Sequence, residues 1–456
     1  MSIFNDLAGS LQRLAYQGAN ALPFTTTTIR IGVTGLSRAG KTAFLTSTAA
    51  NLMAPASKIG RWALAPLGAG DIPRFDQSRH LASLAADPPA WPERTDAASL
   101  LALTTTLPGT LLPSRHVRLE FLDYPGEWLL DLPMLAQTYE AWSQATLARL
   151  QNLALREITA PFLAFAAGVP PRAQADEALA AAGTRLYRAM LSQLRDHGLA
   201  FLQPGRHLMP APGAEAPWLS FFPLPSKGAA GQGPLAGLLS ERYQAYLAAV
   251  RRDLASPMFA NVDRLIILAD ILTALHAGPA AFADMREALA AAAGSLRWQF
   301  SFLEAAGALA SLRLPPRLIE RVAFAATKAD HVAERQRGNL AALMRSLTPT
   351  PGAHIKTGHF AIASVRCTQD FVWTLDGRPV SAVRGRVLGQ QVLTRSYPGE
   401  VPDRPPPTLG EGAEFWQHPF LALPQFEPMR LADGGRLGVP NVGLDALLAF
   451  ILEDLQ

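Results

Sequence analysis

Short apolar runs recur along the chain, and each is bounded by polar or turn-forming residues. In the first run, Ile29, Ile31 and Val33 alternate with Arg30 and Gly32, and this period of two is typical of a strand. Similar runs predict strands over 100–106, 116–122, 262–272, 322–330 and 360–366. Segments with apolar residues every three to four positions predict helices over 1–22, 43–52, 135–155, 175–199, 240–254, 282–312 and 443–455.

The order of these elements predicts an α/β fold with a mostly parallel sheet, because buried strands alternate with helices. Residues 132–256 are rich in alanine and leucine and predict a helical insertion. Residues 371–439 are rich in proline and glycine, and Asp376-Gly377 between two alternating pieces predicts a hairpin in a small β insertion. Residues 54–99 show little periodicity and predict a long irregular loop, which in a compact domain is usually functional or mobile.

A complete G-x-x-x-x-G-K-T pattern separates the first predicted strand from the helix that follows it. Its glycines let the backbone curl so that successive N–H groups point at phosphate oxygens, and the helix adds its positive N-terminal dipole. Lys41 is expected to reach the β- and γ-phosphates as a catalytic group, and Thr42 to offer its hydroxyl to Mg²⁺. The residues expected to contact the nucleotide here are Gly35, Ser37, Arg38, Ala39, Gly40, Lys41, Thr42 and Ala43.

A second motif, Asp123-x-x-Gly126, follows the apolar run 116–122. A carboxylate at the carboxyl end of a strand can bind Mg²⁺ through a water, so Asp123 is a candidate metal ligand. Gly126 is expected to give its N–H to the γ-phosphate as a catalytic group, so that the following loop can sense hydrolysis. Thr95, in the long irregular segment, is a further candidate ligand of the metal.

The run 322–330 ends in the quartet Thr327-Lys328-Ala329-Asp330. This quartet looks like the [NT]-K-x-D guanine-recognition motif of GTPases. A carboxylate in this place can accept hydrogen bonds from the N1–H and the 2-amino group of guanine, whereas adenine does not present these donors. The aliphatic stem of Lys328 can lie over the plane of the base.

Two further positions lie at the same end of the predicted sheet, where the strands have their carboxyl ends. About thirty residues after the quartet, Ala363-Ser364 is similar to the short loop whose backbone N–H meets guanine O6. Asp270 follows another apolar run and is either a carboxylate at the edge of the site or a local turn residue. The second interpretation of Asp270 is favoured.

Composition limits the size, the partners and the compartment that can be expected for the protein. Its 456 residues are 49% apolar and 17% charged, which predicts two or three units with a sizeable core. The net charge of +4 is mild, and no basic cluster indicates a nucleic-acid partner. Cys367 is the single cysteine, so an intrachain disulfide is excluded and a reducing compartment is the simplest setting. No apolar run predicts a transmembrane segment, and the N-terminal residues do not form a secretory signal.

The ordered set GLSRAGKT, DYPGE, TKAD and AS, together with the DPPAWP and FFPLP pieces, resembles the YcjX-like family of bacterial GTP-binding proteins over nearly the whole chain. The resemblance implies a GTPase-like P-loop NTPase core and binding of GTP or GDP with Mg²⁺. It also implies a cytoplasmic or membrane-peripheral location and a link to stress responses. An unidentified protein partner is also expected, with a membrane protein as one candidate.

Six parts are expected along the chain. They are an N-terminal amphipathic helix over 1–24, a first part of the GTPase core over 25–131, the helical insertion over 132–256, a second part of the core over 257–370, the small β insertion over 371–440, and a C-terminal helix on the core over 441–456.

One departure from Ras-like GTPases affects the expected rate. Glu127 follows Gly126, where those proteins have a glutamine that positions water. An anionic side chain facing the γ-phosphate is poorly suited to that task, so slow GTP hydrolysis is expected. Arg74 and Arg94 are candidates for an arginine supplied in cis, and nothing in the sequence selects between them.

Three functions remain open on these grounds. The first is a regulatory GTPase whose loops over 54–99 and 125–132 change with the nucleotide. The second is a P-loop phosphotransferase that acts on a small substrate and uses the helical insertion as a lid. The third is a nucleotide-stabilised scaffold with negligible turnover. The quartet at 327–330 and the Asp123-x-x-Gly126 motif favour the first over the second, and Glu127 leaves the third open.

Overall fold

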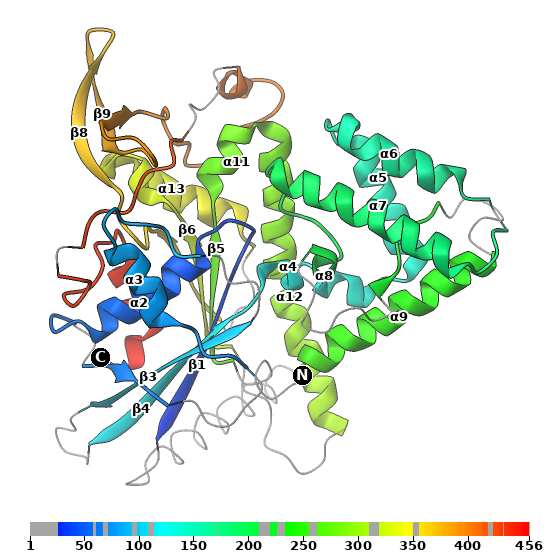
Figure 1. Cartoon of the computed structure of the whole chain (residues 1–456), viewed down its shortest axis with the longest axis horizontal. Coiled ribbons are helices and arrows are strands. Elements are labelled where there is room, and N and C mark those ends of the chain that lie inside the picture. The colour runs from blue at the N-terminus through cyan, green and yellow to red at the C-terminus, as the bar shows by residue number, and fades with distance from the viewer. Residues whose placement is uncertain are drawn as a thin grey trace.

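The structure is a computed structural model (Figure 1). It describes residues 26–57, 61–66, 72–93, 98–107, 114–170, 172–208, 219–225, 233–254, 262–309, 319–349, 355–417, 423–431 and 433–455. The helix predicted over 1–24, the candidate ligand Thr95 and the candidate Arg94 lie outside these residues.

One seven-stranded sheet organises the molecule, in the order β2-β3-β4-β1-β5-β6-β7. The pairs from β4 to β7 are parallel, whereas β2 and β3 pair antiparallel with their neighbours. The prediction of an α/β fold with a mostly parallel sheet is therefore confirmed. The strands are β1 (Thr27–Gly35), β2 (Ala63–Leu64), β3 (Ser99–Leu107), β4 (Arg115–Asp123), β5 (Arg264–Ala269), β6 (Arg321–Ala326) and β7 (Lys356–Ala361).

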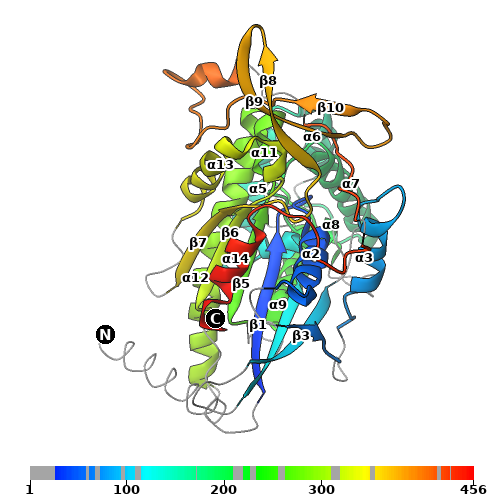
Figure 2. The same ribbon diagram turned by 90° about the vertical axis from the view of Figure 1, so that its left-hand side faces the viewer.

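Helices cover both faces of this sheet. Side chains alternate between the faces along each strand, so the apolar strands present buried side chains on both faces. Ile266 and Leu268 of β5 pack with α2 and α14 on one face, whereas Leu265 and Ile267 pack with α11, α12 and α13 on the other. Figure 2 shows α2 and α14 lying together over the first face. The helices named here are α2 (Lys41–Met53), α11 (Ile271–Ala277), α12 (Pro279–Leu309), α13 (Glu334–Leu347) and α14 (Leu444–Ile451).

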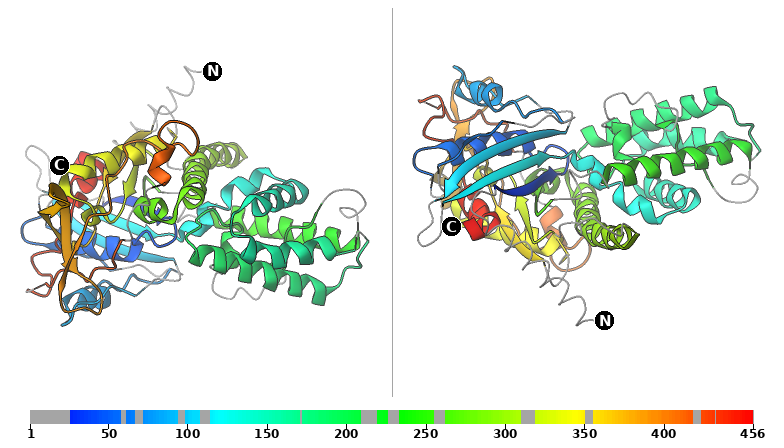
Figure 3. Two further views of the ribbon diagram at one scale, coloured as in Figure 1. Left: turned by 90° about the horizontal axis from the view of Figure 1, so that it is seen from above. Right: turned by 90° about the horizontal axis from the view of Figure 1, so that it is seen from below.

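A helical region between β4 and β5 stands to one side of the sheet (Figures 1 and 3). It has a core of its own, in which the buried rings of Trp142, Tyr187, Phe221 and Tyr243 contact one another edge to face or stacked. Its elements are α4 (Gly126–Leu129), η1 (Leu132–Ala136), α5 (Tyr139–Asn152), α6 (Arg156–Gly168), α7 (Glu177–Asp196), α8 (Gly205–Leu208) and α9 (Pro234–Leu254).

A second, three-stranded sheet follows β7 and projects from the end of the molecule (Figure 2). The hairpin predicted at Asp376-Gly377 is confirmed, because both residues have positive φ between two antiparallel strands. The strands are β8 (Thr368–Leu375), β9 (Arg378–Arg386) and β10 (Leu393–Ser396), and the short helices near the C-terminus are η5 (Ala413–Trp416) and η6 (Glu453–Leu455). The limits 132–256 and 371–440 given for the two insertions remain predictions.

Three local predictions were wrong. The segment 54–99 contains α3 (Gln77–Ala85), a nine-residue helix whose buried face includes the polar Gln77 and His80 beside Leu84. The helix α6 was missed, and it contains Pro161, which normally marks a helix end. The strand predicted over 360–366 ends at Ala361 and is a half-exposed edge strand rather than a buried one.

Within the part of the chain that the structure describes, none of the helices is sufficiently long and apolar to cross a membrane.

Candidate functional site

The phosphate loop connects the carboxyl end of β1 to the first residue of α2. Arg38 and Gly40 both adopt left-handed backbone conformations, with φ of 65° and 80°. Left-handed residues within a turn point successive backbone N–H groups towards one side and form a concave anion site. The N–H of Leu36 donates to Leu268 O at 3.0 Å, which attaches the loop to β5. The geometry is therefore that of a phosphate cradle at a helix N-terminus.

Side chains at this loop have the chemistry of a phosphate and Mg²⁺ site. The buried hydroxyl of Ser37 has no hydrogen-bond partner among the described residues, so it is available to an incoming oxygen. Asp123, 3% exposed, ends β4 opposite Val33 of β1, two residues before Gly35. A carboxylate and the Thr42 hydroxyl are hard oxygen donors of the kind that Mg²⁺ prefers. These residues fit the expected metal.

Gly126 lies directly against the first glycine of the phosphate loop. A Cβ placed on Gly126 would lie 1.7 Å from Gly35 O, and one placed on Gly35 would lie 2.7 Å from Leu268 O. Three backbone segments, from β5, the phosphate loop and the start of α4, are thus in contact without room for side chains. The side chain of Glu127 lies outside the described part of the structure.

Replacing Gly126 by alanine should therefore destabilise the protein, by about 1–3 kcal/mol as for other overpacked sites. It should also weaken nucleotide binding, because the Gly35 backbone must move away. Gly237 is a matched control: it is exposed in α9, a Cβ there meets nothing within 4 Å, and alanine should be neutral or stabilising. Urea unfolding and GDP titration measure both effects. Equal stability and affinity in the two variants would contradict this packing argument.

The Thr327–Asp330 turn stands beside the phosphate loop because β5 supports both. Leu268 O accepts from the phosphate loop, and the next carbonyl, Ala269 O, accepts from Thr327 N at 2.9 Å. Lys328 has a left-handed backbone with φ of 59°, and its ammonium group lies 2.5 Å from the Asp270 carboxylate. Two consecutive residues of one strand thus fix the separation of the two predicted nucleotide loops.

Asp270 combines both of the roles that were weighed for it. Its carboxylate caps α11 by accepting from Thr273 N at 3.0 Å, as expected of a local turn residue. The same carboxylate also forms the ion pair with Lys328 and so lies at the edge of the site. The ion pair therefore fixes the direction in which the Lys328 side chain leaves the Thr327–Asp330 turn.

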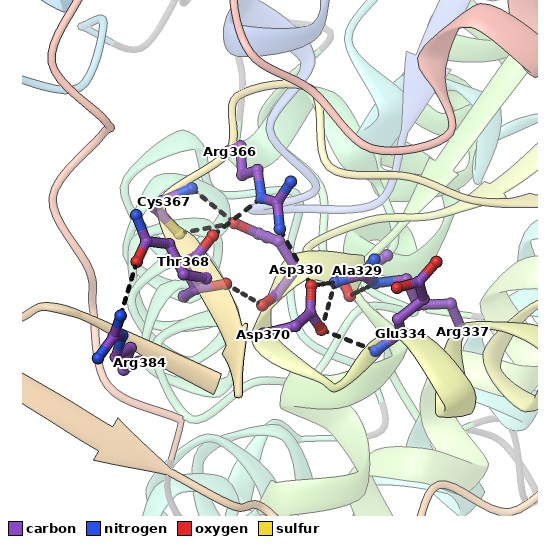
Figure 4. Close-up of polar contacts among 10 residues, drawn as sticks. Ala329, Asp330, Glu334, Arg337, Arg366, Cys367, Thr368, Asp370 and Arg384 are labelled. Carbon is purple, nitrogen blue, oxygen red and sulfur yellow. Dashed lines mark hydrogen bonds and ion pairs between the residues drawn. The ribbon is translucent and has the colours of Figure 1, made fainter. Parts of the chain in front are cut away.

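Asp330 is 1% exposed and its partners come from the segment after β7. Its Oδ2 accepts from Cys367 N at 2.7 Å and from Cys367 Sγ at 2.9 Å, and Thr368 Oγ1 donates to its backbone carbonyl. Figure 4 shows these contacts together with the ion pairs of Asp370 with Arg337 and Arg366. Sequence reasoning missed Cys367 and Thr368 as neighbours of Asp330.

The backbone N–H of Ala363, predicted to bind guanine O6, has another partner in the structure. Its N–H donates to Val442 O at 2.9 Å, and its carbonyl accepts from Val442 N at the same distance. This N–H is therefore already engaged in the described structure, whereas the segment at Cys367 lies against Asp330. The assignments of Ala363 and Ser364 to the base remain predictions.

Helices α7, α8 and α9 of the helical region contact the phosphate loop and the segment just after Gly126. Arg38 of the loop pairs with Asp196 at the end of α7, at 3.2 Å between exposed groups. Arg206 of α8 lies over the Trp128 ring, 4.6 Å from its centroid. Asp131 is fully buried, accepts from Gly205 N at 2.7 Å and from the Tyr246 hydroxyl, and burial raises its pKa to about 6.

Arg74, a candidate for an arginine supplied in cis, binds another part of the chain. Arg74 Nη2 donates to Ala65 O at 2.8 Å, so its guanidinium holds the edge of the sheet together. The residues of the first three motifs lie at the carboxyl ends of β1, β4 and β6, and Ala363 and Ser364 follow β7. These four strands are parallel, so their carboxyl ends lie at the same end of the sheet.

Comparison with known proteins agrees with this arrangement. The model of the YcjX-like family matches residues 29–455. The chain belongs to the YcjX-like family. A curated relative of this family, Ras-like GTPase YcjX of Escherichia coli (strain K12), is 34% identical over 93% of this chain and 95% of its own length. Ras-like GTPase YcjX of Shewanella oneidensis is 31% identical over 93% of this chain and 94% of its own length.

Proposed function

We propose that this YcjX-like protein binds guanine nucleotides with Mg²⁺ and hydrolyses GTP slowly as a regulatory switch. The observation that carries the proposal is the support of both nucleotide loops by consecutive carbonyls of β5, Leu268 O and Ala269 O. A phosphate cradle and a carboxylate suited to guanine thus face the same sheet edge, where ligands of such sheets bind. The names of the two relatives support the same chemistry.

Each residue of the proposed site has one role. Lys41 and the loop N–H groups bind and orient the phosphates, and Ser37 offers a further hydroxyl. Thr42 and Asp123 would hold Mg²⁺, which supplies charge neutralisation on the β- and γ-phosphates when bound. Asp330 accepts from the base. Gly126 presents its backbone to the terminal phosphate, and its contact with Gly35 makes it sensitive to any change in the loop.

The proposed switch would act on the helical region. The segment after Gly126 leads within five residues to Asp131, whose carboxylate is bound to α8 and α9. The stacking of Arg206 on Trp128 adds a second attachment. A movement of Gly126 when the terminal phosphate leaves would therefore be transmitted to α8. A link to stress responses, the cytoplasmic or membrane-peripheral location and a protein partner rest on the family resemblance and remain predictions.

The test is to denature the purified full-length protein, identify any released nucleotide, and then measure single-turnover hydrolysis of GTP and ATP. We expect guanine nucleotide and a GTP rate below about 10⁻² per second, as for unstimulated Ras-like enzymes. Release of adenine nucleotide with ATP turnover would favour the phosphotransferase and contradict the proposal. Guanine nucleotide without any turnover would replace the switch by a nucleotide-stabilised scaffold.

A further inference from the structure

The only cysteine of the chain is placed against the carboxylate proposed to read the base. Cys367 contributes two hydrogen bonds to one oxygen, Asp330 Oδ2: its backbone N–H at 2.7 Å and its thiol at 2.9 Å (Figure 4). Cys367 is 5% exposed and Asp330 is 1% exposed. Water therefore has little access to this oxygen, and its orientation depends on these two donors.

The thiol keeps its proton and so acts as a donor. Burial, and then the neighbouring Asp330 carboxylate, raise the pKa of Cys367 well above its usual range. His331, whose Nε2 lies 3.6 Å from the sulfur, has a pKa lowered by burial. A neutral imidazole leaves the thiol proton directed at the stronger acceptor, the carboxylate.

The backbone of Cys367 is held rigidly. Arg366 N donates to Pro440 O at 2.7 Å, and the Arg366 guanidinium donates to Thr368 O at 2.9 Å. A Cβ on Gly385 of β9 would lie 2.7 Å from Cys367 O, so β9 packs closely behind it. Cys367 is therefore fixed by the second sheet on one side and binds Asp330 on the other.

We infer that Cys367 is a positioning residue for base selectivity, which rests on the proposed role of Asp330. A carboxylate has about four acceptor sites. The two donors of Cys367 occupy both sites of Oδ2, so the two sites of Oδ1 remain for the N1–H and the 2-amino group of guanine. Without the thiol, Oδ2 keeps only the backbone donor, and the carboxylate can rotate away from the plane that matches both base donors.

The experiment compares Cys367→Ala and Cys367→Ser with the unmodified full-length protein. GDP, IDP and ADP are titrated, because inosine retains N1–H but lacks the 2-amino group. The unmodified protein should prefer GDP to IDP by roughly ten- to hundredfold, the value of a hydrogen bond to a charged acceptor. Alanine should narrow this ratio to about threefold. Serine retains both donors and should keep the ratio close to that of the unmodified protein.

The ratio of GDP to IDP affinity distinguishes positioning of the Asp330 carboxylate from a general loss of stability, because a loosened fold weakens GDP and IDP binding alike. An unchanged GDP-to-IDP ratio in Cys367→Ala would overturn the inference. So would a ratio narrowed as much by serine as by alanine, which would assign the effect to sulfur packing. If the unmodified protein binds ADP as tightly as GDP, the proposed function itself fails, and this outcome is read from the unmodified protein alone.

Discussion

Replacing Lys41 by alanine should abolish tight GDP binding and leave the fold intact. Lys41 is the first residue of α2 and follows the left-handed Gly40, so its ammonium group emerges where the loop and the helix dipole converge. A lost charge-assisted contact to phosphate costs about 1.5–3 kcal/mol, and this lysine is expected to reach two phosphates. The GDP dissociation constant should therefore rise by about a hundredfold or more. Calorimetric titration measures it directly.

Lys356 offers a matched control for this substitution. It begins β7, at the opposite end of the strands from the phosphate loop, and its exposed ammonium group lies 3.4 Å from Glu453. Lys356→Ala should leave GDP affinity unchanged, since exposed ion pairs contribute little. Circular dichroism and urea unfolding should give the same result for both variants and the unmodified protein. Full GDP affinity in Lys41→Ala would remove the phosphate loop from the proposed function.

The second large effect is expected at Asp330, where asparagine should shift the preference from guanine to xanthine. The donors of Cys367 make the orientation of the new amide predictable. Cys367 N–H and S–H point at Oδ2, so the amide oxygen must take that place and the NH₂ group must face the base. Guanine then meets a donor where it needs an acceptor. Xanthine presents the same N1–H to this NH₂ group, but it carries a carbonyl in place of the 2-amino group, and this carbonyl accepts from the NH₂ group.

GDP affinity should fall roughly ten- to hundredfold in Asp330→Asn, XDP affinity should rise, and ADP should bind weakly to both proteins. Asp376→Asn is the control, because Asp376 lies in the β8–β9 hairpin turn with φ of 47° and Asn-Gly suits that turn as well as Asp-Gly. The titrations are made with GDP, XDP and ADP. If Asp330→Asn retained its GDP affinity, the Thr327–Asp330 turn would be a strand end without a part in base recognition.

The positions of the phosphate loop, of Asp123 and Gly126, and of the Thr327–Asp330 turn could be predicted because each follows a buried strand. Parallel strands bring their carboxyl ends to the same end of the sheet. The contact of Cys367 with Asp330 spans 37 residues. It depends on how the chain turns after β7, and apolar periodicity carries no information about that turn. The helix α3 escaped detection for another reason: Asp76 caps it locally, but its buried face includes Gln77 and His80 as well as Leu84. With nine residues, this helix is shorter than the stretch of chain over which apolar periodicity indicates a helix.

Residues 127–131, just after Gly126, would lose their support if residues 132–256 were cut away. Asp131 would be left without Gly205 and Tyr246, and Trp128 without Arg206. The Arg38–Asp196 pair at the phosphate loop would be lost in the same operation. A shortened protein consisting of the sheet and its covering helices would thus have an altered phosphate loop, which is the proposed nucleotide site, even if it folded. Hydrolysis and exchange rates measured on such a fragment would describe a different molecule from the intact chain.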